Sequence, residues 1–295
     1  MTTRTSDLLA TAMAPVIWGS TYSVTTEFLP GFSPMTVALL RALPAGLLLL
    51  LIVRQLPRGV WWARILILGA LNFSIFWSLL FVAAYRLPGG VAATVGAVQP
   101  LAVVFIAAAL LGNKVRRVSV VSAIVGLGGV ALLVLSPEAA LDTAGVAAGL
   151  GGAISMALGT VLTRKWQPPV SLLTFTAWQL TAGGILLVPI VLLFEPAMPV
   201  PTTANLFGLA WLGLVGAALT YVLWFRGIAR IEPAAVSLLG FFSPATAVLL
   251  GWLFLGQSLA PLQVAGVLLV VGSIWLGQRA GDARRAGHTS DLANA

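Results

Sequence analysis

Ten long apolar runs constrain the fold of this chain more than any other feature. A helix needs about 20 apolar residues to cross a bilayer, and only helices or closed barrels satisfy their backbone hydrogen bonds there. The runs are continuous rather than alternating, which favours helices. The sequence therefore predicts an all-α integral membrane protein with ten transmembrane helices, at residues 8–28, 34–53, 63–85, 90–111, 118–135, 144–163, 170–194, 205–227, 234–255 and 261–278.

The composition agrees with a membrane protein and argues against several functions. Hydrophobic residues make up 59% of the chain and charged residues 8%, whereas a soluble domain has about 25% charged residues. The net charge of +8 is typical of arginines kept beside the cytoplasmic ends of membrane helices, so it does not indicate nucleic acid. There is no cysteine, and the one histidine, His288, lies in a polar tail. We therefore expect no metal site, no catalytic residues and no cofactor.

The positive charges predict the orientation of the chain. If the N-terminus is cytoplasmic, fourteen of the sixteen Lys and Arg residues fall on the cytoplasmic side of the ten helices. Arg86 alone falls on the other side, and Arg41 lies within the second run. Cytoplasmic loops carry an excess of Lys and Arg, so the sequence predicts that both termini are cytoplasmic.

The sequence also contains an internal repeat. A shift of 144 residues places Arg86 on Arg230 and Leu111-Gly112 on Leu255-Gly256 without a gap, and shorter shifts place Gly19 on Gly159 and Arg41 on Gln179. We therefore predict two five-helix repeats, at 1–136 and 143–278. Because five is odd, the second repeat runs inverted, which is typical of secondary transporters. The polar segment 279–295 is predicted to be a disordered cytoplasmic tail.

The repeat carries a Gly-x-x-x-Pro motif twice, from Gly96 to Pro100 and from Gly240 to Pro244. Proline inside a helix removes one hydrogen bond and clashes with the carbonyl four residues back, which here belongs to glycine. The motif is either an ordinary kink that packs well or a hinge that lines a cavity. Its presence at matching positions of both halves favours a hinge or gating role.

These residues resemble a known superfamily. Trp18-Gly19-Ser20 in the first run, Arg41 in the second and the paired Gly-x-x-x-Pro helices are similar to the drug/metabolite transporter superfamily, specifically its ten-helix EamA-type exporters. The resemblance covers residues 8–278. It implies alternating access through a central cavity lined by helices 1, 3, 4, 6, 8 and 9. Within the superfamily the chain looks most like amino acid exporters, including the YddG-like aromatic amino acid exporters.

Few ionisable residues lie within the predicted spans. Arg41 is about 10 Å deep in its helix, and an intramembrane charge is a functional candidate by default. It either binds a substrate carboxylate or is structural, and the resemblance places helix 2 outside the first layer of the cavity. The acidic residues lie at span ends, in loops or in tails, which argues against antiport of cationic drugs for protons. Glu27, the deepest, is either a proton-coupling group or a solvated helix end.

Neutral polar and aromatic side chains are the candidates for substrate binding. Asn and Gln in lipid need partners and therefore face inward, and aromatic rings supply broad faces. Such a lining suits a small zwitterion with an apolar side chain, although for any single aromatic the favoured alternative is packing against lipid or the protein core. The candidate binding residues are Trp18, Ser20, Tyr22, Asn72, Phe76, Trp77, Gln99, Thr220, Tyr221, Trp224, Phe242 and Ser243.

The sequence thus predicts a secondary transporter of the inner (plasma) membrane that exports amino acids, aromatic or other apolar ones first, or related metabolites. The alternative is another small solute, such as a nucleoside, a sugar or a neutral drug. A channel would use rings of carbonyls or charges, and two kinked helices do not indicate such rings. Ten helices can enclose one cavity, so we expect a monomer in the bilayer.

Overall fold

The computed structural model describes residues 3–87, 89–134, 142–254, 258 and 260–293. All regular elements in these ranges are helical, and no strand occurs among them. The elements are α1 (Thr3–Phe28), α2 (Pro34–Val53), α3 (Trp61–Gly69), η1 (Ala70–Ser74), α4 (Ile75–Arg86), α5 (Gly89–Gly96), α6 (Gln99–Leu111), α7 (Arg117–Val134), α8 (Thr143–Lys165), α9 (Leu172–Phe194), α10 (Thr203–Ala210), η2 (Trp211–Leu219), α11 (Thr220–Arg230), α12 (Pro233–Leu239), α13 (Phe242–Phe254) and α14 (Pro261–Ala293).

The helices have the length and composition of membrane spans. In the described part of the chain, nine helical spans are long and apolar enough to cross a membrane, and they coincide with the second to tenth predicted runs. Helix α1 covers the first predicted run but is more polar. Large apolar side chains lie on the outside of the bundle, with Leu192 76% and Phe194 79% exposed. A surface of this kind is stable in lipid rather than in water.

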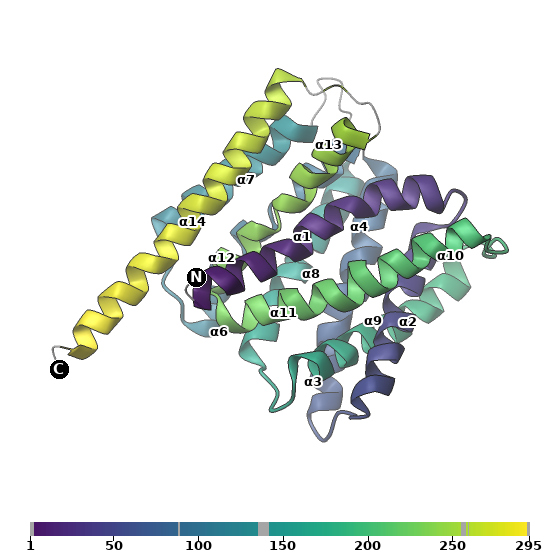
Figure 1. Ribbon diagram of the computed structural model, residues 1–295, viewed down its shortest axis with the longest axis horizontal. Helices are drawn as coiled ribbons and strands as arrows, with labels where there is room; N and C mark the ends of the chain where they lie inside the picture. The colour runs from purple at the N-terminus through teal and green to yellow at the C-terminus, as the bar shows by residue number, and fades with distance from the viewer. Residues whose placement is uncertain (1–2, 88, 135–141, 255–257, 259, 294–295) are drawn as a thin grey trace.

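Small residues allow the long helices to pack closely at two edges of the bundle. Figure 1 shows α7 and α14 side by side at one edge, and α2 and α9 lie together at another. A Cβ added to Gly46 of α2 would lie 2.5 Å from the backbone nitrogen of Thr181 in α9. One added to Gly129 of α7 would lie 2.9 Å from the backbone nitrogen of Val270 in α14. Glycine is required where helix backbones approach this closely.

Helices α1 and α11 run antiparallel to each other (Figure 1), and their contacts define the two ends of the bundle. Asp7, near the start of α1, is hydrogen-bonded to Arg226 near the end of α11. At the other end, Asn205 of α10 donates to the backbone carbonyl of Phe28. We call the end that holds Asp7 the proximal end and the end that holds Phe28 the distal end.

Two helices contain π-helical segments that apolar patterning did not predict. The predicted run 63–85 is divided into α3, η1 and α4, and the run 205–227 into α10, η2 and α11. A π-helical turn bonds residues five apart and widens the helix locally. The hydrophobic content of a span is unchanged by such a turn, so composition gives no signal for it.

The final helix is longer than its predicted span. Helix α14 continues through Ala293, whereas the sequence predicts disorder from residue 279. The segment contains several Ala and Arg residues, which have high helix propensities and extend an existing helix at little cost.

Candidate functional site

A cavity of about 450 Å³ lies within the bundle and is lined from both halves of the chain. Its wall includes residues of α1, α4, α5, α6, α8, α11, α12 and α13. These elements belong to the first, third, fourth, sixth, eighth and ninth predicted spans, which are the helices that the resemblance implied. The wall also includes four residues of α2, which are Pro34, Val37, Ala38 and Arg41. This corrects the expectation that the second predicted span lies outside the first layer of the cavity. Residues from the α1–α2 connection, such as Phe32, place one side of the cavity near the distal end.

Both Gly-x-x-x-Pro motifs break their helices at the cavity. Helix α5 ends at Gly96 and α6 begins at Gln99, while α12 ends at Leu239 and α13 begins at Phe242. Proline lacks the N–H that would bond the glycine carbonyl, which favours a break, although α1, α2 and α9 continue past Pro15, Pro44 and Pro189. Gly96, Pro100, Gly240 and Pro244 all line the cavity, and a Cβ added to Gly96 would meet nothing within 4 Å. The predicted kinks are therefore present and face the cavity.

Aromatic side chains cover one wall of the cavity. The ring of Trp18 lies 5.1 Å from that of Tyr221 and 5.2 Å from that of Trp224, measured between centroids. Phe73 connects Trp77 at 5.3 Å to Tyr221 at 4.6 Å. These spacings are typical of tilted and edge-to-face aromatic pairs. Rings from both halves of the chain therefore form one continuous surface.

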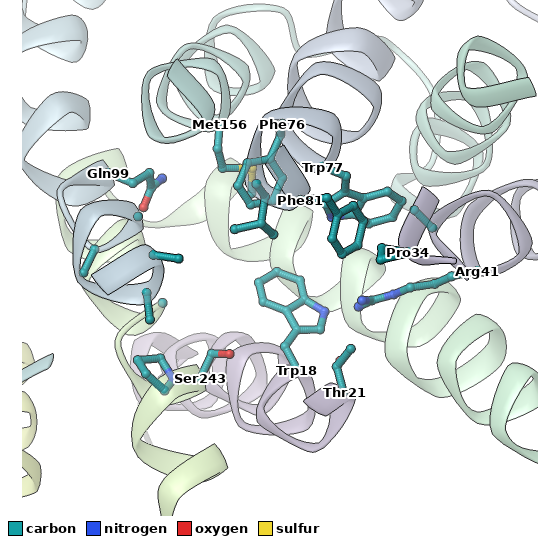
Figure 2. A pocket seen from close by; sticks show the side chains of 18 of the residues that line it. Trp18, Thr21, Pro34, Arg41, Phe76, Trp77, Phe81, Gln99, Met156 and Ser243 are labelled. Atoms are coloured by element: carbon teal, nitrogen blue, oxygen red, sulfur yellow. The ribbon is translucent and has the colours of Figure 1, made fainter. Parts of the chain in front are cut away.

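Arg41 reaches the cavity from α2 and is anchored on the π-helical segment η2. Its Nη2 donates to the backbone carbonyl of Gly216 at 2.6 Å, and its guanidinium carbon lies 5.4 Å from the centre of the Trp77 ring. The same carbonyl accepts from Trp18 Nε1 at 3.1 Å and from Thr220 Oγ1 at 2.8 Å. In Figure 2 the guanidinium lies beside the Trp18 indole. These bonds hold Arg41 and Trp18 against the cavity wall.

Seven of the predicted binding residues line the cavity, and four do not. Asn72 is buried away from it and donates to Thr163 Oγ1 at 3.1 Å and to Gln179 Oε1 at 2.8 Å. Three more predicted residues also lie outside the lining. Ser20 donates to the carbonyl of Ile17, Thr220 Oγ1 accepts from Trp18 Nε1, and Phe242 packs against the core. The side chain of Tyr22 lies outside the described residues. The seven lining residues are Trp18, Phe76, Trp77, Gln99, Tyr221, Trp224 and Ser243.

Only part of the predicted binding face of the first helix lines the cavity. Trp18, Thr21 and Thr25 line the cavity, because residues three and seven apart share one face of a helix. Ser20, two residues from Trp18, points elsewhere and accepts from Trp211 Nε1. Helical spacing from Trp18 would have selected Thr21 and Thr25. Phe81 and Met156, also missed, are visible in Figure 2 on the wall opposite Trp18.

An ion cluster joins α1 to α11 at the proximal end. Asp7 Oδ1 accepts from Nε and Nη2 of Arg226 at 2.9 and 2.7 Å and from Nη1 of Arg230 at 2.9 Å. Asp7 precedes the first predicted span. Burial acts to raise the pKa of this carboxyl, but its hydrogen bonds and Coulombic attraction to the two arginines prevail, so the pKa lies below its ordinary value of 3.8. The cluster is therefore ionised near neutral pH.

The apolar helical bundle is that of a multi-pass membrane protein, and its central cavity is lined from both halves of the chain. The chain belongs to the EamA-like transporter family, within the drug/metabolite transporter superfamily, and the family matches residues 5–135 and, separately, 143–277.

Similar proteins agree with this assignment. The chain is 46% identical over 263 residues to protein PecM of Dickeya dadantii, covering 88% of each chain. It is 27% identical over 266 residues to the inner membrane transporter YedA of Escherichia coli, covering 88% of this chain and 87% of YedA. A probable terminal-alkyne amino-acid exporter of Streptantibioticus cattleyicolor is 25% identical over 292 residues, covering 95% and 96%. A solved crystal structure shares the fold, with a TM-score of 0.80 at 21% identity over 94% of this chain and 99% of the other.

Proposed function

We propose that the protein is a secondary transporter that exports a small metabolite by alternating access between two inverted five-helix repeats. The observation that carries this proposal is the cavity of about 450 Å³, which is lined from both halves of a chain in a transporter family. The volume lies within the range of small-molecule sites. A cavity between inverted repeats can be exposed to either side when the repeats exchange conformations.

Two features support the internal repeat. The family matches the chain twice, with boundaries close to the predicted repeats. The 144-residue shift also carries η1 (Ala70–Ser74) onto residues 214–218, which lie inside η2 (Trp211–Leu219). Two π-helical segments at corresponding positions are not expected by chance, because such segments are rare.

A polar contact recurs in both halves and supports the same symmetry. In one half, Asn72 of η1 donates to Gln179 of α9. In the other, the carbonyl of Gly216 in η2 accepts from Arg41 of α2. The sequence shifts place Asn72 on Gly216 and Arg41 on Gln179. Corresponding residues therefore meet across corresponding helices.

The contacts at the two ends of the bundle support a defined conformational state. We call Asp7, Arg226 and Arg230 the proximal ion cluster. Their hydrogen bonds hold the proximal end of the bundle together, away from the described residues that line the cavity. At the distal end, Arg86 and Asp142 lie 3.7 Å apart with side chains 54% and 42% exposed. Arg86 corresponds to Arg230 in the repeat. We infer a state that is closed proximally and accessible distally, and the opposite state is expected to exchange the tight and loose contacts.

The positive charges support an orientation with both termini cytoplasmic in an inner (plasma) membrane. Ten membrane crossings, including α1, give this arrangement. The proximal end is then cytoplasmic, so the described state faces outward. The cavity is formed by one chain, which supports transport by a monomer.

Amino acids and related metabolites are the first candidates for the cargo. The aromatic wall formed by Trp18, Trp77 and Tyr221 suits an apolar or aromatic side chain. One similar protein is named a probable terminal-alkyne amino-acid exporter. The second candidate is another neutral solute, such as a nucleoside, for which the same stacking surface would serve.

Counterflow in proteoliposomes tests the proposal. Vesicles that contain the purified protein are loaded with unlabelled phenylalanine, threonine, uridine or glucose and then given the labelled solute outside. We expect protein-dependent, saturable accumulation of at least one solute. Empty vesicles provide the background, and the Tyr221→Ala variant provides a protein control with an altered wall. Accumulation no greater than in empty vesicles for amino acids, nucleosides and sugars alike would contradict a transport function.

A further inference from the structure

The cavity wall carries a positive charge and no acidic side chain among its described lining residues. Arg41 is the charged residue in that lining, and the wall holds no Asp or Glu. The carbonyl of Gly216 that accepts from Arg41 is a neutral group and leaves the guanidinium charge in place. Charge within a membrane protein is costly and marks a pathway or a ligand site. The wall is therefore suited to an anionic group.

Polar atoms elsewhere on the wall strengthen this preference. Trp224 Nε1, Gln99 Nε2 and Thr21 Oγ1 are buried and have no hydrogen-bond partner among the described residues, and all three residues line the cavity. An indole nitrogen and an amide nitrogen can only donate, and a hydroxyl can donate as well. Buried polar groups are almost always paired, so these unpaired donors are available to acceptors on a ligand once their side chains turn toward the cavity.

The donors lie around an aromatic surface. Figure 2 shows Arg41 and Gln99 on opposite sides of Trp18, with Phe76, Trp77 and Phe81 facing the same space. Planar rings bind well against faces of this kind. A ligand that fits would have an aromatic body and acceptor groups at its ends.

We propose that the cargo is a small aromatic carboxylate without an ammonium group, such as an arylalkanoate or an aromatic 2-oxo acid, and that Arg41 binds its carboxylate. This inference rests on the proposed transport function and narrows its cargo. An ammonium group would meet the like charge of Arg41 and no carboxylate on the wall. A free amino acid therefore binds more weakly than its deaminated counterpart, and an amine binds most weakly.

Three ligands with the same phenyl ring and two-carbon chain test the charge preference on the unmodified protein. They are 3-phenylpropionate, which has only the carboxylate, phenylalanine, which has both charges, and phenethylamine, which has only the ammonium. Binding to the full chain in lipid nanodiscs is followed by tryptophan fluorescence, because Trp18, Trp77 and Trp224 line the cavity. Binding is preferred to flux here, since the neutral forms of the acid and the amine cross bilayers unaided.

The expected order of affinity is 3-phenylpropionate, then phenylalanine, then phenethylamine, with about tenfold or more between the first and the last. Equal affinities, or tighter binding of phenylalanine or phenethylamine than of 3-phenylpropionate, would overturn the inference. Saturable phenylalanine counterflow without binding of 3-phenylpropionate would overturn it while leaving the transporter intact. The absence of any protein-dependent flux would instead remove the proposed function.

Variants of Arg41 assign the preference to this side chain. Arg41→Gln is expected to weaken 3-phenylpropionate binding about 10- to 100-fold, the range for a lost charge-assisted hydrogen bond, and to abolish the discrimination against phenethylamine. Arg41→Lys keeps the charge and is expected to keep the order of affinities. Arg58→Gln removes a charge from an exposed residue outside the cavity and serves as the matched control. An unchanged order in Arg41→Gln would exclude Arg41 as the carboxylate site, and the ligand series on the unmodified chain remains decisive if that variant fails to fold.

Discussion

Removal of the charge on Asp7 is expected to open the proximal end of the bundle. Asp7→Asn keeps the size of the side chain and one acceptor oxygen, but it removes the charge that binds Arg226 and Arg230. The carboxylate accepts three hydrogen bonds of 2.7–2.9 Å in this cluster. The described state should lose this stabilisation, whereas a state with α1 and α11 separated never had it.

The structure sets the size of the effect. The Asp7 side chain is 12% exposed, but those of Arg226 and Arg230 are 35% and 50% exposed. A fully exposed ion pair contributes about 0.2–1 kcal/mol, and breaking a buried one costs about 3–5 kcal/mol. This half-buried cluster falls between those limits, so we expect a loss of about 1–2 kcal/mol. That corresponds to a shift of about 5- to 30-fold in the equilibrium toward the proximally open state.

The assay uses a cysteine placed in the cavity, since the natural sequence has none. Ser243→Cys is nearly isosteric and lines the cavity. Its labelling by a membrane-impermeant thiol reagent from the proximal face reports the population of the proximally open state when opening is fast compared with labelling. Glu27→Gln makes the same charge change at an exposed position at the other end of α1 and should leave the rate unchanged. A change of less than twofold in Asp7→Asn would refute the reasoning.

The remaining predictions concern pH, packing, the aromatic wall and the hinges. The pKa of Asp7 is lowered in the folded protein, so the cluster stabilises the described state above the unfolded value near 3.8, and this stabilisation is lost as pH falls through the lower folded pKa. The ratio of the proximal labelling rates with and without Asp7→Asn, both measured at one pH so that the thiolate fraction cancels, should therefore not change between about pH 5 and about pH 8. Gly46→Ala should lower the thermal unfolding midpoint in detergent, because its Cβ would lie 2.5 Å from the Thr181 nitrogen and such overpacking costs about 1–3 kcal/mol; Gly128→Ala, which meets nothing within 4 Å, should not. Tyr221→Ala should reduce counterflow without preventing membrane insertion, and wild-type flux would remove Tyr221 from the site. Pro244→Ala should slow turnover because the helix can straighten, and unchanged turnover would refute a hinge there.

Much of the architecture could be predicted from the sequence because a bilayer imposes simple rules. Nine of the ten predicted runs coincide with the spans of the structure, since length and hydrophobicity alone define a crossing helix. The helix breaks at Gly96 and Gly240 follow in part from local chemistry, because each glycine precedes a proline by four residues, although Pro15, Pro44 and Pro189 lie inside helices that continue. The family assignment then rests on the same residues and is confirmed by the match to both halves.

The site was harder to predict because it depends on which face each helix presents. The sequence predicts that Asn72 lines the cavity, but Asn72 is buried against Thr163 and Gln179. Hydropathy does not indicate which of these environments a polar residue within a span occupies. The resemblance places the second span outside the first layer of the cavity and leaves open whether Arg41 binds a carboxylate or is structural; in the structure Arg41 lines the wall, and its side chain reaches Gly216. The accepting carbonyl lies in a π-helical segment, for which the sequence carries no pattern. The proximal ion cluster joins residues 219 positions apart, so only the folded chain brings them together.

Access to one cavity residue from both faces of the membrane tests the central claim most directly. Ser243→Cys in the otherwise unmodified chain would be exposed to impermeant thiol reagents in right-side-out and in inverted membrane vesicles. Alternating access predicts labelling from both faces, with protection from either face by a transported solute. Labelling from a single face in both kinds of vesicle, unaffected by any solute that the protein transports, would contradict transport by exchange between two states of the repeats.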